Sequence, residues 1–319
     1  MFEIKNALRN NTFQLEIELH QEEEKILNTE EALSLALNNK LSSNISNEYK
    51  RNLIYIHNDF IEFLSSDEKN AEITNLKTSR IEAFLSLYHT SGTYYMNKRR
   101  DLGVLFSTVS KLIQQPLQMV KTTSTRRTNS KLHKVYESEQ LRSVLNYLIK
   151  QHHHLYLCCL ITYGCFLRPH KEVRKLTAGH FKKGITEIHL SGSENKGKKV
   201  RVVYIPDYVR NELEELLPSL KHSDNIFSRN TTPYNEAYFN TAWTRAWRKM
   251  YVLGIVEKNH TIYSFRHTAA VEVYQRTKDV NLLKSLLGHS SILVTLKYLR
   301  GLGEYNEEML KDAAPRLEF

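Results

Sequence analysis

The chain has 319 residues, of which 41% are hydrophobic and 25% are charged, a composition typical of a globular protein with about two domains. Its net charge of +10 favours a polyanionic partner. No uninterrupted apolar stretch reaches the ~18 residues that a membrane-spanning helix needs, and the first residues carry no signal-peptide pattern, so we expect a cytoplasmic protein with no membrane partner.

Residues 1–45 are rich in Glu and Leu, and we expect them to form an N-terminal helical extension or arm. A helix is predicted to start near Asn28 or Thr29, because acidic residues then fall in its first turn. The next helix is predicted to follow Ser46, a favourable N-cap residue, and its apolar residues recur at three- and four-residue steps up to Leu64. The segment after Ser46 therefore predicts a helix with one buried face.

Two further amphipathic segments follow, at about 74–90 and 93–115. With the helix after Ser46 they predict an all-helical domain over residues 46–118. The second segment carries a basic cluster opposite its apolar face, and this cluster is either solvated surface or a surface that faces DNA. The sequence favours neither reading. The cluster consists of Lys98, Arg99 and Arg100.

A polar, basic stretch follows Pro116, which ends the preceding helix. No acidic residue occurs between Asp101 and Glu137, and Ser and Thr are frequent. This composition predicts an interdomain linker over residues 119–134. Flexible basic linkers often lie along a phosphate backbone. The residues expected to do so are Arg126, Arg127 and Lys131.

A second domain is predicted over residues 135–319. A helix at about 137–150 leads into the apolar run LYLCCLITYGCFL, whose length favours a buried helix over a strand. The run ends at Arg168, and an arginine at the end of a buried helix is held in one orientation, as a phosphate-binding residue must be. The alternative is an arginine that caps the helix or forms a salt bridge.

Three cysteines, Cys158, Cys159 and Cys165, fall within this run without any metal-ligand spacing. We interpret them as small core residues of a protein in a reducing compartment. The three histidines at 152–154 are consecutive, so on a helix they point in different directions. Solvated surface is therefore the better interpretation, and no metal site is expected.

A β-hairpin is predicted next, because apolar residues at 185–190 and 200–205 flank a turn rich in Gly, Ser, Asn and Lys. Lysines crowd the tip of this hairpin. They either protect an exposed sheet edge by their charge or bring a lysine to a reacting phosphate. The lysines are Lys196, Lys198 and Lys199.

The segment from Tyr263 to Tyr298 holds the strongest motif. Arg266 lies at the opening of a helix, and the tripeptide Leu287-Gly288-His289 comes one helix before Tyr298. Arginine offers a rigid set of donors that fits phosphate oxygens, and a tyrosine hydroxyl can act as a covalent nucleophile. This combination points to phosphate chemistry.

The order and spacing of these residues resemble the tyrosine recombinase (phage integrase) family over residues 135–319. The resemblance implies a mainly α fold with a small antiparallel β-hairpin or sheet, built as a two-domain DNA clamp. Residues 46–118 resemble the family's helical core-binding domain, and residues 135–319 its catalytic domain. The positions that match the family's catalytic residues are Arg168, Lys196, Arg266, His289 and Tyr298.

Two positions depart from the family pattern. Glu172 corresponds to the acidic residue that supports the first arginine, but it comes one residue later than the commoner spacing. Tyr263 stands where the family usually has histidine, three residues before the second arginine. An unperturbed tyrosine titrates near 10, so it does not readily accept a proton at neutral pH, although it can donate a hydrogen bond to phosphate. His260 and His267 are possible substitutes, but neither is at the motif position.

The resemblance implies a site-specific recombinase that acts on double-stranded DNA without metal, ATP or another cofactor. Tyr298 would form a 3′-phosphotyrosyl link, while the two arginines bind the phosphate and Lys196 protonates the leaving oxygen. The family resemblance also implies a homotetramer on DNA, in which residues 301–319 pack against a neighbouring subunit, and a nucleoid-associated location in the bacterial cytoplasm.

Three other readings remain open from the sequence. One is a DNA-binding protein of the same fold that lacks catalysis, which the tyrosine at position 263 would suit. The second is a type IB topoisomerase-like enzyme that relaxes DNA with the same nucleophile. The third is a helical interaction protein with no nucleic-acid role.

Overall fold

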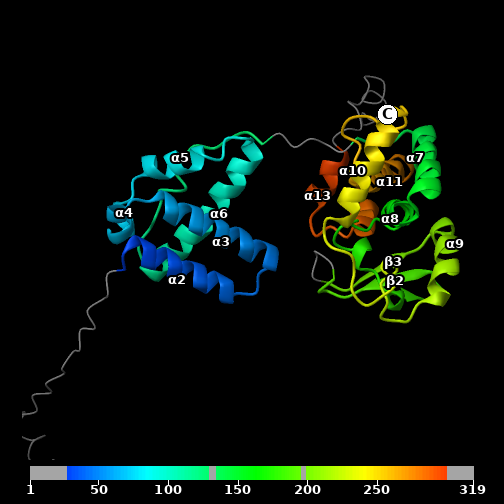
Figure 1. The fold of residues 1–319 in the computed structure, drawn as a ribbon, viewed down its shortest axis with the longest axis horizontal. Coiled ribbons are helices and arrows are strands. Elements are labelled where there is room, and N and C mark those ends of the chain that lie inside the picture. The colour runs from blue at the N-terminus through cyan, green and yellow to red at the C-terminus, as the bar shows by residue number, and fades with distance from the viewer. Residues whose placement is uncertain (1–26, 129–133, 195–198, 300–319) are drawn as a thin grey trace, which may run out of the picture. The chain divides into compact units, whose positions relative to one another are not determined.

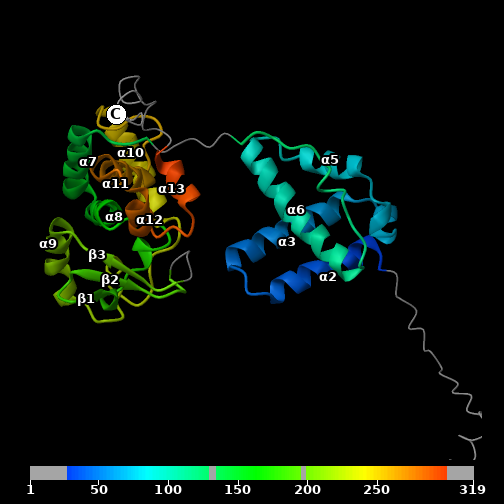
Figure 2. The ribbon, with the colours of Figure 1, turned by 180° about the vertical axis from the view of Figure 1, so that it is seen from behind.

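A computed structural model describes residues 27–128, 134–194 and 199–299 of the chain. The chain divides into two compact units, Met1–Ser130 and Lys131–Phe319 (Figures 1 and 2). The described part is mainly helical with one small antiparallel sheet, which confirms the predicted fold class. No helix within these ranges is both long and apolar enough to cross a membrane.

The first unit is all helical, and its helix starts follow local sequence signals. Asn28 caps the first described helix in a reciprocal capping box with Glu31, as the acidic start of that helix predicted. Ser46 caps the next one by accepting a hydrogen bond from the Tyr49 backbone N–H, also as predicted. The helices are α2 (Thr29–Ser42), α3 (Asn47–Phe63), α4 (Ser66–Asn70), α5 (Thr78–Ser86) and α6 (Gly92–Leu112), with a 3-10 turn at Ile73–Asn75.

The core of the first unit is built around three edge-to-face aromatic rings. The ring of Phe60 lies 4.9 Å from that of Phe84 and 5.8 Å from that of Phe106, measured between centroids. These three side chains come from α3, α5 and α6 and are almost completely buried. The helix predicted over 74–90 is shorter in the structure, because the 3-10 turn replaces its start.

The predicted linker at 119–134 begins later than expected, because its first part packs on the first unit. Arg99 donates hydrogen bonds to the Thr123 side chain over 2.8 Å and to the Lys121 carbonyl over 2.8 Å. The Glu82 carboxylate accepts a hydrogen bond from the Ser124 backbone N–H over 3.0 Å. Val120 and Leu117 are buried in the core beneath. The polar composition of this stretch therefore reflects hydrogen bonding to the unit.

The second unit is organised around the buried helix α8 (His153–Gly164), which packs against helices before and after it in the chain. The other elements of the unit are α7 (Ser138–Gln151), β1 (Phe181–Lys182), β2 (Glu187–Leu190), β3 (Arg201–Tyr204), α9 (Asp207–Leu216), α10 (Tyr238–Val252), α11 (Ile262–Thr277), α12 (Val280–Leu287) and α13 (Ile292–Leu299), with 3-10 turns at Val173–Lys175, Ala178–His180 and Leu217–Ser219.

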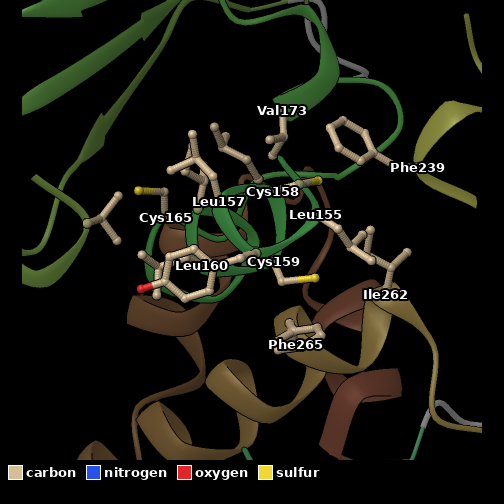
Figure 3. Close-up of a cluster of buried hydrophobic side chains, with 14 of the residues drawn as sticks. Leu155, Leu157, Cys158, Cys159, Leu160, Cys165, Val173, Phe239, Ile262 and Phe265 are labelled. Atoms are coloured by element: carbon tan, nitrogen blue, oxygen red, sulfur yellow. The ribbon is translucent and has the colours of Figure 1, made fainter. Parts of the chain in front are cut away.

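The three cysteines belong to the core of the second unit. Cys158 and Cys159 lie on α8 among apolar side chains that include Phe239 and Phe265, and Cys165 follows the helix (Figure 3). All three are free thiols and are completely buried. Burial raises the pKa of the Cys165 thiol to about 12, so this sulfur stays protonated and behaves as an apolar core atom.

Helix α8 ends earlier than the apolar run predicted, at Gly164. Phe166 has a φ of 52°, a left-handed conformation that a bulky residue rarely adopts, and it turns the chain out of the helix. Arg168 therefore lies in a turn beyond the helix, and the contacts within this turn determine its orientation. The packing of Phe166 against Ala270 and Leu287 holds the turn in place.

The predicted hairpin is present as β2 and β3, with an additional short strand, β1, on the other side of β2. All three strands are antiparallel, and Ile188 pairs with Val203 at the centre of the hairpin. Both of these side chains point into the core. Lys196 and Lys198, at the predicted tip, lie outside the described residues.

Candidate active site

Three of the predicted site residues meet at one point of the second unit. The Nε atom of Arg266 on α11 lies 3.4 Å from the Tyr298 hydroxyl on α13. The Nη2 atom of Arg266 lies 3.5 Å from Nε2 of His289. The rings of His289 and Tyr298 are 5.4 Å apart. The guanidinium, the imidazole and the phenol are thus close neighbours.

Arg266 is completely buried, and its guanidinium is only partly satisfied by the described residues. Its Nη2 atom donates to the Leu287 carbonyl over 2.8 Å. Its Nη1 atom has no hydrogen-bond partner among the residues that the structure describes. Burial lowers the pKa of Arg266, because the charged form loses hydration. An anion placed beside Nη1 would supply both an acceptor and a counter-charge.

His289 is held by the chain on both sides of it. Gly288 adopts a left-handed conformation, with a φ of 64°, and ends α12 immediately before the histidine. The Nδ1 atom of His289 lies 3.0 Å from Oγ1 of Thr295, a completely buried residue on α13. Sequence reasoning missed Thr295, although its position three residues before Tyr298 places both on one helix face.

Arg168 is fixed by Glu172 through two hydrogen bonds. Its Nη1 atom donates to Oε1 of Glu172 over 2.6 Å, and its backbone N–H donates to Oε2 over 2.8 Å. The Glu172 side chain is inaccessible to solvent. Although Glu172 comes one residue later than the commoner spacing of the family, its carboxylate still contacts Arg168. Arg168 and Arg266 are close enough for the charge of each to act on the other.

Tyr263 lies at the start of α11, close enough to Arg266 and Arg168 for their charges to act on it. Burial raises its pKa above the ordinary value of 10, and the nearby charges of Arg266 and Arg168 oppose this rise without reversing it. The phenol is therefore protonated at neutral pH. The ring of His170 lies 5.7 Å away, and its Nδ1 atom has no hydrogen-bond partner among the described residues. Sequence reasoning did not single out His170.

The two histidines considered as substitutes have different surroundings. His260 is buried against Tyr136, with ring centroids 4.3 Å apart, and its Nδ1 accepts a hydrogen bond from the Glu257 backbone N–H over 3.0 Å. It is therefore a core residue. His267 is also buried, but its ring lies 5.3 Å from that of Tyr298. His267 is thus a buried neighbour of the Tyr298 ring.

The basic cluster on α6 is occupied by contacts inside the first unit. Lys98 lies 3.5 Å from the Asp59 carboxylate, and Arg100 lies 2.9 Å from that of Asp101. Arg99 holds the segment after α6, as described above. Each of the three cations thus has a partner within the first unit, and Arg99 has a structural role.

The other predicted DNA-binding residues fall into two groups. The guanidinium of Arg126 lies over the Tyr95 ring, 4.3 Å from its centroid, and Arg127 is exposed. Lys199 lies just before β3. Lys131, like Lys196 and Lys198, lies outside the described residues.

Within the described ranges, no group of three or more His, Cys, Asp or Glu residues is arranged to hold a metal ion.

Comparison with known sequences identifies a protein family and a curated relative. The model of the phage integrase family matches residues 134–303. A probable integrase/recombinase of Bacillus subtilis (strain 168), YoeC, is 26% identical over 165 residues, which represent 50% of this chain and 85% of YoeC. The matched region of the family model includes every described residue of the candidate site.

Comparison with solved structures shows the same fold over most of the chain. The integrase of transposon Tn1549, in complex with a circular intermediate DNA, matches with a TM-score of 0.69 and 15% identity, over 88% of this chain and 98% of that one. A lambda integrase dimer bound to a COC′ core site matches with a TM-score of 0.67 and 14% identity, over 96% and 89%. XerH recombinase bound to a palindromic difH substrate matches with a TM-score of 0.59 and 21% identity, over 84% and 78%.

Proposed function

Since the chain belongs to the phage integrase family, whose model matches more than half of its length, we propose that it is a site-specific DNA recombinase that cleaves and rejoins DNA through a 3′-phosphotyrosyl intermediate. The observation that carries this proposal is the buried Nη1 atom of Arg266. It lacks a partner among the described residues and lies in the guanidinium whose Nε faces the Tyr298 hydroxyl. A phosphodiester at this point would meet a nucleophile and a cation together.

Each residue then has a defined part in the cleavage step. The Tyr298 oxygen forms a bond to phosphorus while the bond from phosphorus to the 5′ oxygen breaks. Arg168 and Arg266 bind the non-bridging oxygens and stabilise the charge of the pentacoordinate transition state. His289 donates a further hydrogen bond. The leaving 5′ oxygen takes a proton from Lys196, and the phenol proton is released to water.

Rejoining is the reverse of this step with a different strand. A 5′ hydroxyl attacks the phosphotyrosyl bond and releases Tyr298. Because the covalent intermediate keeps the energy of the phosphodiester bond, the proposed cycle needs neither ATP nor a metal ion. The partner is double-stranded DNA with specific sites, and the assembly is a homotetramer. The tail at 301–319, expected to pack against a neighbouring subunit, lies outside the described residues. We place this activity at the bacterial nucleoid, in the cytoplasm.

Three solved structures of similar fold support the DNA partner, because each of them contains DNA. A protein of the same fold that binds DNA without cleaving it is the alternative that Tyr263 favours, since the family's usual proton-accepting histidine is missing there. A type IB topoisomerase-like activity would share the cleavage step but would not exchange strands between two sites.

The covalent intermediate provides the test. The protein is incubated with nicked duplexes made from the DNA that flanks its own gene, so that the cleaved strand diffuses away and the adduct is trapped. We expect a protein–DNA adduct on a denaturing gel with the wild type and none with Tyr298→Phe. Salt-sensitive, site-specific binding without any adduct would instead support the non-catalytic alternative. Exchange of strands between two duplexes separates a recombinase from a topoisomerase.

A further inference from the structure

Arg201 connects three separate segments around the candidate site. It is the first residue of β3, and its side chain is only 12% exposed. Its Nη2 atom donates to the Leu286 carbonyl over 2.6 Å and lies 3.5 Å from the Phe166 carbonyl. Its Nη1 atom lies 3.5 Å from Oε2 of Glu172. One guanidinium thus joins β3, the turn after α8 and the end of α12.

Each of these contacts leads to a residue that would bind the phosphate. The Glu172 carboxylate, whose Oε2 faces Arg201, holds Arg168 through its Oε1. The Leu286 carbonyl that Arg201 binds is followed directly by the Leu287 carbonyl that Arg266 binds. Both carbonyls lie at the C-terminal end of α12, where the helix dipole favours cations. Arg201 is therefore linked to Arg168 through Glu172, and to Arg266 through the C-terminal end of α12.

Gly288 shows how closely the chain is fitted around this arginine. A Cβ atom at position 288 would lie 2.9 Å from Cζ of Arg201, closer than side-chain contacts normally come. The residue also has a φ of 64°, which side chains rarely adopt. Glycine is thus needed here for two reasons, the left-handed turn before His289 and the space that the guanidinium occupies.

A lysine at position 201 would not reproduce these contacts. The planar guanidinium presents Nη1 and Nη2 in fixed directions, toward a carboxylate and a carbonyl at the same time, whereas an ammonium group is a single point charge. Burial lowers the pKa of Arg201 to about 10, and the Glu172 carboxylate opposes this effect, so the side chain remains charged at neutral pH. Its charge also offsets that of the solvent-inaccessible Glu172.

We infer that Arg201 is a positioning residue for DNA cleavage, which sets the distance between Arg168 and Arg266 by holding Glu172 and the end of α12 together. The inference rests on the proposed cleavage reaction, and it assigns to β3 a function that the sequence did not reveal. Arg201 would not touch the phosphate. It would act through the two arginines that do.

The test compares Arg201→Met and Arg201→Lys with the wild type in single-turnover adduct formation at saturating protein. Misplacement of reacting groups by about 1 Å can slow a reaction ~100-fold. We expect a loss of that order for Arg201→Met, partial recovery for Arg201→Lys, and unchanged DNA affinity for both. Lys183→Met is the matched control, because it removes a cation that pairs with Glu187 of the same sheet over 2.9 Å. It should cleave at the wild-type rate.

A different pattern is expected if Arg201 only stabilises the fold. Arg201→Met would then lower the melting temperature and the fraction of active protein, but the active fraction would still cleave at the wild-type rate. An Arg201→Met rate equal to that of Lys183→Met would overturn the inference. If the wild type itself forms no adduct on any flanking duplex, the cleavage proposal fails, and a second measurement decides the role of Arg201.

That second measurement uses inorganic phosphate as the probe and needs no DNA sequence. Phosphate that binds the folded protein at Arg168 and Arg266 raises the melting temperature of the protein by mass action. The wild type and Lys183→Met should show this rise relative to chloride at equal ionic strength, and Arg201→Met should not. A rise of the same size in Arg201→Met would contradict the positioning role, whatever the outcome with DNA.

Discussion

The Nδ1 atom of His289 lies 3.0 Å from Oγ1 of Thr295, which is three residues before Tyr298 on α13. The helix that carries the candidate nucleophile therefore also fixes the histidine that faces it. Because Thr295 is completely buried, this contact is shielded from competing water. The relative positions of the imidazole and the phenol are thus set by a single short helix.

Thr295→Val should slow cleavage without preventing folding. Valine has nearly the same shape but cannot bind Nδ1, so the imidazole loses its fixed orientation. We expect adduct formation to slow by ~10- to 100-fold through this misplacement. The loss of one buried hydrogen bond should lower the free energy of unfolding by about 1 kcal/mol. Single-turnover cleavage and urea denaturation measure the two effects, and Thr295→Ser, which keeps the hydroxyl, is the control.

Tyr263→Phe tests whether the phenol that replaces the family's histidine takes part in the chemistry. The raised pKa of Tyr263 keeps it protonated at neutral pH, so it can donate a hydrogen bond to the phosphate but cannot act as a base. Loss of one donor to a developing charge should slow cleavage by ~100-fold. DNA affinity should remain the same. A Tyr263→Phe enzyme that cleaves at the wild-type rate would show that this hydroxyl has no part in the reaction.

The sequence alone predicted the parts of the site that depend on local signals. The apolar helix before Arg168 and the hairpin after it are both encoded within a few residues. The order of arginine, Leu-Gly-His and tyrosine was therefore enough to predict that these residues belong to one domain. The capping residues Asn28 and Ser46 likewise gave the start of two helices.

The parts that were missed depend on contacts between distant segments. Arg201 reaches Leu286, which is 85 positions away, and nothing near either residue signals this contact. The early end of α8 follows from the left-handed conformation of Phe166, which a bulky residue does not predict. The start of the linker was misplaced because Arg99 and Glu82 hold a polar segment that resembles a solvated one.

Gly288→Ala should destabilise the second unit more than the same change at another left-handed glycine. Gly254 has a φ of 74°, and a Cβ atom added there would have no described atom within 4 Å, whereas at Gly288 the same atom would lie 2.9 Å from Arg201. The backbone conformation alone costs about 1–2 kcal/mol for alanine. We expect Gly254→Ala to lose that amount and Gly288→Ala to lose more. Equal losses would mean that Arg201 moves aside freely.

The two tryptophans make this comparison specific. The chain contains two tryptophans, Trp243 and Trp247, and both lie on α10 in the second unit. Their fluorescence therefore follows the unfolding of this unit in urea without a signal from the first. Gly288→Ala should also slow adduct formation, because the clash displaces Arg201 or His289, whereas Gly254→Ala should cleave normally.

The stability of the second unit should fall as the pH drops from about 6.5 to 5. Burial is the main cause that lowers the pKa of four of its histidines below the ordinary value of 6.5. In this range the unfolded chain binds protons that the folded unit does not, so unfolding becomes more favourable. Their stabilising contribution is complete above 6.5. The histidines are His152, His154, His170 and His260.

Three carboxylates of the second unit lose their stabilising contribution at lower pH than these histidines. The pKa values of Glu187, Glu194 and Glu257 lie below their ordinary value of 4.5, so the stability that these carboxylates contribute is lost only below that pH. Urea denaturation followed by tryptophan fluorescence at pH 7.5, 6.5 and 5.5 gives the slope. His170→Gln should reduce this slope, since one imidazole whose pKa is lowered by burial is removed. An unchanged slope in His170→Gln would show that the loss of stability in acid arises from other groups.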